Sequence, residues 1–199
     1  MLINPLVDIQ SRVLCLSSRT PICAVIESLQ FFGRNPEPIW LHLLGYDEDS
    51  HQPSRLSAFE FLRLRAVLSA MRTPVHALAV GCLQDYEPLV LASCHPSCRH
   101  ILQGAMISVG PLRLDDLPFP GAELEVPADV GTEWNITKNH LRRQLDEVLG
   151  ALSLDPHLWL KERVLSAQAA VKAGLADSVI DIKELSTKKG EPENPSGDQ

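Results

Sequence analysis

The stretch "VHALAVGCLQDYEPLVLA", residues 75–92, decides how the chain folds. Its first apolar run ends at Val80 and meets a glycine, a few small or polar residues and then a second apolar run. This layout predicts a buried strand over 75–80 that turns sharply into a helix over about 86–94. Many hydrolases mount an exposed nucleophile at such an elbow. Here the residue at the start of the helix is an acid, Asp85.

The segments before the elbow alternate in the same way between strand and helix. Thr20 and Pro21 predict a helix start with threonine as the cap. Ser57 and Glu60 form a capping-box pattern that opens a second helix, which ends near Arg72. Short apolar runs predict strands over 12–16, 38–44, 75–80 and 105–109. Strands that alternate with helices predict an α/β fold of repeated βαβ units with a mostly parallel sheet.

The second half of the chain contains the longest predicted helix, over about 132–153. Its apolar stripe consists of Trp134, Leu141, Leu145, Val148 and Leu152. The string "HPSCRH" (95–100) predicts a loop, and the prolines of 111–131 predict an irregular excursion. Residues 166–182 predict a capped helix that closes at Gly174 and leads into a last strand. We therefore expect a single domain over 1–182 and a disordered polar tail over 183–199.

Composition excludes several classes of partner. The chain has 199 residues, of which 45% are hydrophobic, and this is enough for one sizeable core. Its net charge of −7 argues against nucleic acid or an anionic membrane surface as a partner. The N-terminal string "MLINPLVDIQ" lacks the basic start and apolar centre of a signal peptide, so we expect a cytoplasmic protein. We expect no cofactor.

The five cysteines lie in or beside apolar runs, and their odd number predicts reduced, buried thiols. Three residues in one turn, Cys94, Cys98 and His100, are potential metal ligands. Their spacing is irregular for zinc and no second ligand pair follows at the usual distance, so the string is a weak metal candidate. We expect no metal site.

The order of several longer strings resembles the proteolytic subunit of the Clp protease, a crotonase-like family of serine peptidases. The resemblance covers most of residues 11–182. It is carried by "SRVLCL", "ESLQFFGRNPEPIWLHL", "VGCLQDYEPLVLASC", "HLRRQLDEVLGAL" and "ERVLSAQAAVKAGLADSVI". It implies a crotonase-like fold whose long helix, about 132–153 here, projects from the head as a handle.

The resemblance also implies where catalysis is expected. The family is an ATP-dependent serine endopeptidase that uses a serine, a histidine and an acid. The serine of its elbow falls on Asp85, the histidine falls on Gly110, and the acid falls on Glu162. The Gly-Gly pair that supplies the oxyanion hole is represented by the single glycine Gly45. We therefore expect no intact catalytic triad.

Two other roles are open to these acids. Asp85 can cap the first turn of the following helix and complement its dipole, which stabilises a helix by about 1 kcal/mol. Alternatively, Asp85 and Glu162 can face each other across a vacated pocket, and such a carboxylate pair would share a proton or hold a cation. We favour the capping role.

The expected function is that of a non-catalytic Clp proteolytic-subunit-like protein. It would assemble into a ring with active peptidase subunits and modulate ATP-dependent proteolysis, with an AAA+ unfoldase as a further partner. Loop 45–55 and segment 111–131 have no assigned role. One alternative is an active peptidase or other hydrolase with a relocated nucleophile, for which the candidates are Ser93, Ser97 and Ser108. The other alternative is a crotonase-type acyl-CoA enzyme.

Overall fold

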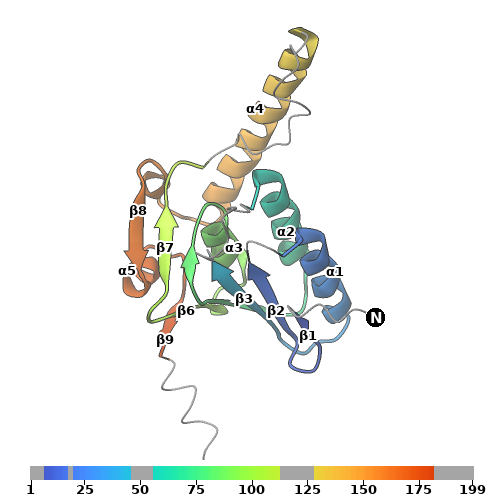
Figure 1. Ribbon diagram of the computed structural model, residues 1–199, viewed down its shortest axis with the longest axis vertical. Helices are drawn as coiled ribbons and strands as arrows, with labels where there is room; N and C mark the ends of the chain where they lie inside the picture. The colour runs from blue at the N-terminus through green and yellow to red at the C-terminus, as the bar shows by residue number, and fades with distance from the viewer. Residues whose placement is uncertain (1–6, 18–19, 46–55, 113–127, 182–199) are drawn as a thin grey trace, which may run out of the picture.

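The computed structural model describes residues 7–17, 20–45, 56–112 and 128–181, with the side chains of the last segment described from residue 135 (Figure 1). The strands are β1 (Val7–Asp8), β2 (Val13–Ser17), β3 (Ile39–Gly45), β4 (Val75–Ala79), β5 (Cys82–Leu83), β6 (Arg99–Leu102), β7 (Met106–Val109), β8 (Arg163–Ser166) and β9 (Ser178–Ile180). The helices are α1 (Ile22–Phe32), α2 (Ala58–Ala70), α3 (Glu87–Ser93), α4 (Ala128–Ala151), the short 3₁₀ helix η1 (Pro156–Trp159) and α5 (Ala167–Lys172).

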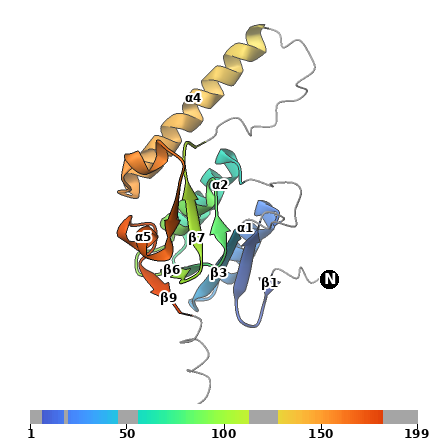
Figure 2. The same cartoon turned by 60° about the vertical axis from the view of Figure 1, so that its left-hand side comes forward.

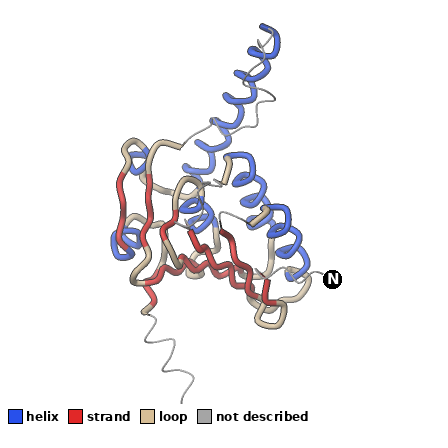
Figure 3. The backbone as a smooth tube through the Cα atoms, viewed as in Figure 1, coloured by secondary structure: helices blue, strands red, loops and turns tan. Residues whose placement is uncertain are grey.

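The main sheet has six strands in the order β1-β2-β3-β4-β6-β9, and all neighbours except β1 and β2 are parallel. A second, three-stranded sheet, β5-β7-β8, stands beside it (Figure 3). The predicted α/β class and mostly parallel sheet are confirmed. The crossovers carry α1, α2 and α3 onto one face of the main sheet (Figure 1).

The core lies between that sheet face and the three helices. In β3, Ile39, Leu41 and Leu43 are fully buried, while Trp40 and His42 between them are half-buried on the opposite face. This alternation has a period of two because successive strand side chains point to opposite faces. One face of the main sheet therefore carries the core, and the other is only partly covered.

Helix starts follow the predicted signals with one correction. The Ser57 hydroxyl accepts from the Glu60 amide at 3.3 Å, and a Glu60 carboxylate oxygen accepts from the Ser57 amide at 3.0 Å, so the capping box is confirmed. The prediction for Thr20 is wrong by one residue, because Pro21 takes the capping position of α1. The Thr20 hydroxyl instead accepts from the Ser17 amide at 3.0 Å and secures the turn out of β2.

Four strands lie where no strand was predicted. Strand β1 precedes the first predicted strand, β6 begins at Arg99 inside the predicted loop 95–100, and β5 and β8 belong to the second sheet. Each is only two to four residues long. Runs this short carry no readable period, so their pairing depends on partners distant in the sequence.

Helix α4 begins at Ala128, four residues before the predicted start, and ends at Ala151. Its C-terminal half packs against α2 and buries Leu141, Leu145 and Val148. Its N-terminal half extends beyond the body of the molecule, where Ile136 is 63% exposed (Figures 1 and 2). Only the C-terminal half of the apolar stripe therefore packs into the core of the chain.

Several predictions fall outside the described residues. These are most of loop 45–55, most of segment 111–131, the Trp134 side chain and the tail 183–199. Within the described ranges, no helix combines the length and the apolar character that crossing a bilayer requires.

Candidate functional site

The elbow between β4 and α3 is built on two close backbone approaches. A Cβ atom added to Gly81 would lie 2.1 Å from the Leu44 carbonyl oxygen, and one added to Gly45 would lie 2.3 Å from the Cys82 carbonyl oxygen. Gly45 also has a φ of +73°, which favours glycine. The end of β3 and the start of β5 therefore touch backbone to backbone, and only glycine fits at either position.

Asp85 occupies an unusual backbone conformation in this elbow. Its φ is +51°, in the left-handed region that Asp tolerates better than most residues. The helix begins only at Glu87, and Tyr86 takes the capping position. The prediction that Asp85 is the capping residue of α3 is therefore wrong. The turn needs one left-handed residue before the helix can begin, and Asp85 provides it.

Glu87 is the acid of the first helical turn and reaches back into the elbow. The backbone amide of Gln84 donates to Glu87 Oε2 at 3.1 Å. Burial raises the pKa of Glu87 to about 7; the Gln84 amide opposes this and the negative charge of Asp85 adds to it. The Glu87 carboxyl thus changes charge near neutral pH inside the elbow.

The structure brings Gly110 and Glu162 together. Strands β7 and β8 are antiparallel with Val109 opposite Arg163, so Gly110 and Glu162 continue the same register. A Cβ atom on Gly110 would lie 3.0 Å from Glu162 Cγ and 3.4 Å from Glu162 Cα. The Glu162 side chain therefore occupies the space beside Gly110. The residue before Gly110, Val109, is buried and apolar.

The topology of the small sheet relates Asp85 to this pair. Strands β5 and β7 are parallel, with Leu83 opposite Ile107, so the chain leaves both strands at the same end. Asp85 follows Leu83 there, and Glu162 immediately precedes β8 at that end. Glu162 is exposed, so its carboxylate is solvated and the paired-carboxylate hypothesis gains no support. The described residues contain no cluster of three or more His, Cys, Asp or Glu side chains that could bind a metal.

The three serines considered as relocated nucleophiles differ in their exposure. The Ser93 hydroxyl is buried, Ser97 is exposed in a turn with a φ of +72°, and Ser108 is half-buried on β7. Within the part of the chain that the structure describes, none of these hydroxyls forms a hydrogen bond with a histidine.

A different serine does contact a histidine. Ser178 Oγ and His100 Nδ1 lie 2.8 Å apart, and the two residues are register partners in β9 and β6. They belong to the main sheet and not to the β5-β7-β8 end where Asp85, Gly110 and Glu162 lie. Sequence reasoning missed this pair because the two residues are 78 positions apart, and only strand pairing brings them together.

His100 is part of an aromatic row on the sheet face opposite the helices. Its ring stacks on Trp40 and His76 with centroid distances of 5.8 and 5.9 Å. Burial, followed by the nearby His76, lowers the pKa of His100. The adjacent carboxylate, Asp177, is engaged by Arg99 through two side-chain hydrogen bonds, so it does not orient the imidazole. The Ser178–His100 contact thus lacks the acid of a triad.

The weak metal candidate is not assembled. Cys94 is buried, which raises the pKa of its thiol to about 12 and keeps it protonated. Cys98 Sγ lies 3.8 Å from His76 Nε2, and His100 is directed to Ser178. All five cysteines are free, and Cys94 and Cys98 are buried as predicted. Cys15 and Cys82 are only half-buried and Cys23 is exposed, so the prediction of buried thiols is wrong for these three.

No model of a known protein family matches the chain, and a search of curated proteins finds no significant relative.

Proposed function

We propose that this chain is a non-catalytic Clp proteolytic-subunit-like protein of the crotonase-like fold. It assembles into a ring with active peptidase subunits in the cytoplasm and modulates ATP-dependent proteolysis there. Its partners are homologous proteolytic subunits and, through the ring, an AAA+ unfoldase. The resemblance over residues 11–182 supplies the family, and the geometry at one end of the small sheet supplies the argument against catalysis.

One observation carries the non-catalytic part of the proposal. The positions assigned to base and acid, Gly110 and Glu162, are in contact, and the acid fills the space beside the glycine. With Asp85 at the position of the nucleophile, neither the hydroxyl nor the imidazole that acyl transfer requires is present there.

The projecting half of α4 supports the assembly part. Ile136 lies on the part of α4 that leaves the body, is 63% exposed, and is not covered by any of the residues that the structure describes. A handle that interleaves with other subunits would cover it.

Two alternatives remain as proposals. A crotonase-type acyl-CoA enzyme needs two backbone donors beside the acyl carbonyl, and the close packing of Gly45 on Cys82 leaves that stretch engaged with the elbow. A hydrolase with a relocated nucleophile is favoured by one observation only, the contact between Ser178 and His100.

Affinity purification of the tagged chain tests the assembly, with the stoichiometry of co-purifying proteins as the measurement. We expect peptidase subunits to be recovered in a fixed ratio. The variant Ile136→Asp should reduce this recovery, while Asn139→Asp, which adds the same charge at another exposed position of α4, should not. Recovery of the wild-type chain as a lone monomer would contradict the proposal.

A fluorophosphonate probe tests the absence of catalysis. We expect no labelled serine in the purified chain. Labelling that is lost in Ser178→Ala would instead identify the hydrolase alternative, and stabilisation of the chain by acyl-CoA compounds would identify the acyl-CoA enzyme.

A further inference from the structure

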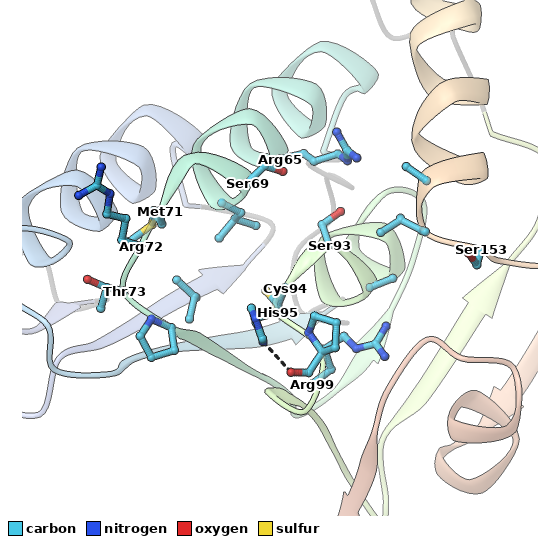
Figure 4. A pocket seen from close by; sticks show the side chains of 17 residues that line it. Arg65, Ser69, Met71, Arg72, Thr73, Ser93, Cys94, His95, Arg99 and Ser153 are labelled. Atoms are coloured by element: carbon cyan, nitrogen blue, oxygen red, sulfur yellow. Dashed lines mark hydrogen bonds between the residues drawn. The ribbon is translucent and has the colours of Figure 1, made fainter.

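A cavity of about 600 Å³ lies at the end of α3 that is farther from the elbow (Figure 4). Its walls come from the C-terminal ends of α2, α3 and α4 and from the segment that leads into β4. Three arginines line it, and no carboxylate from the described residues does. In a chain whose net charge is −7, such a concentration of positive charge needs an explanation.

Two hydrogen-bonding atoms in this wall are buried without a partner. Arg65 Nε and Ser93 Oγ make no hydrogen bond to any described residue. Figure 4 shows the Arg65 side chain leaving α2 toward α4, and the Ser93 hydroxyl leaving α3 toward Arg65. Leaving a buried polar group unpaired costs about 1–3 kcal/mol. Because Arg65 Nε can only donate, the missing partner must be an acceptor.

The charge in the cavity is available to a ligand. Arg99 is already neutralised, since it binds the Asp177 carboxylate and donates to the Gly174 carbonyl oxygen at 3.0 Å. Within the described part of the chain, neither Arg65 nor Arg72 forms an ion pair. The acceptor that best fits the Arg65 guanidinium and the Ser93 hydroxyl together is an oxyanion with several oxygens, and phosphate is the common case.

The cavity is larger than a bare phosphate ion would need. Small-molecule sites in proteins occupy roughly 300–1,000 Å³, and this cavity falls within that range. Leu68, Val75 and Leu152 form an apolar wall that a phosphate ion alone would leave uncovered. A small phosphate ester with an apolar or aromatic body would use both parts of the wall.

We propose that this cavity binds a small phosphate ester, with Arg65 and Ser93 as the donors to the phosphate. This site lies apart from the degenerate elbow, and it does not depend on the function proposed above. It gives the chain a ligand-binding role of its own.

Isothermal titration with inorganic phosphate and with phenyl phosphate tests the proposal, at an ionic strength held constant with sodium chloride. We expect both to bind, and phenyl phosphate to bind about tenfold more tightly because its ring covers the apolar wall. Arg65→Gln should weaken phosphate binding about tenfold or more. The matched control is Arg63→Gln, an exposed arginine two residues earlier on α2 that does not line the cavity and should change binding less than about twofold.

Two further variants separate binding from folding. Arg65→Lys keeps the charge but removes the Nε donor, and Ser93→Ala removes a hydroxyl that has no described partner. Both should weaken phosphate binding without lowering the melting temperature of the ligand-free chain. The proposal would be overturned if phosphate bound no more tightly than chloride, or if Arg63→Gln and Arg65→Gln lost phosphate affinity equally. Water would then be the hydrogen-bond partner of both donors.

Discussion

The elbow and the arginine cavity lie at opposite ends of α3 and are built in opposite ways. At the elbow, backbone approaches backbone around Gly45 and Gly81, and Glu162 fills the space beside Gly110. In the cavity, about 600 Å³ stays open and two buried polar atoms lack partners among the described residues. At the elbow, the close contacts are made within the chain itself. In the cavity, Arg65 Nε and Ser93 Oγ have no hydrogen-bond partner among the described residues. The comparison therefore favours the cavity over the elbow as a ligand-binding site.

The largest effect is expected where the elbow is tightest. Gly45→Ala and Gly81→Ala each place a Cβ atom within 2.3 Å of a backbone oxygen, so each should lower the free energy of unfolding by about 3 kcal/mol or more. Gly150→Ala is the control, because its Cβ meets nothing within 4 Å inside α4, and it should stabilise by about 0.5–1 kcal/mol. Urea unfolding measures all three. Similar behaviour of the three variants would show that the elbow is not closely packed.

Filling the space beside Gly110 should have the next largest effect. Gly110→His forces the new side chain against Glu162 and should lower the free energy of unfolding by about 1–3 kcal/mol through overpacking. Adding Glu162→Ala should restore part of this loss, so a double-mutant cycle measures the contact directly. Wild-type stability in Gly110→His alone would mean that Glu162 moves aside and that this space can hold a histidine.

Glu87 makes the elbow sensitive to pH. Its pKa is raised from an ordinary 4.5 to about 7, so between these values the folded chain holds a proton that the unfolded chain has lost. Glu87 therefore lowers stability as the pH rises through this window. Glu87→Gln should stabilise the chain by about 1–2 kcal/mol at pH 8 and by much less at pH 4. Chemical unfolding at the two pH values measures the difference, and a constant gain at both would rule out titration of Glu87.

The smallest effect is expected in the cavity. Ser93→Ala should stabilise the ligand-free chain by about 1 kcal/mol or less, because it removes a buried hydroxyl that has no described partner. Ser57→Ala, at the capping box of α2, is the matched serine control and should cost about 1 kcal/mol. If Ser93→Ala proved the more costly, the hydroxyl would have a structural partner, and its role in binding would be lost.

Much of the architecture could be read from local patterns. Apolar runs bounded by turn residues predicted β2, β3, β4 and β7, and the capping box predicted where α2 begins. Gly174, with a φ of +78°, closes the last helix as its position after "AQAAVKA" predicted. These signals are local because hydrogen bonding within a helix and the alternation of a strand depend on neighbours in the chain.

Features that depend on distant residues could not be read in this way. The contact of Gly110 with Glu162 depends on the antiparallel register of β7 and β8, and the contact of Ser178 with His100 depends on the pairing of β6 with β9. The partial burial of α4 depends on its packing against α2. No spacing in the sequence encodes these distances.

The amino-acid sequence by itself determined the α/β class, the helix signals and the absence of serine and histidine at the positions that the resemblance assigns to catalysis. Only the tertiary structure decided that the space beside Gly110 is filled and that Arg65 and Ser93 share a cavity wall. The physical reason is that chemical identity and periodicity are properties of the chain. Whether a side chain has a hydrogen-bond or packing partner depends on the tertiary structure as a whole.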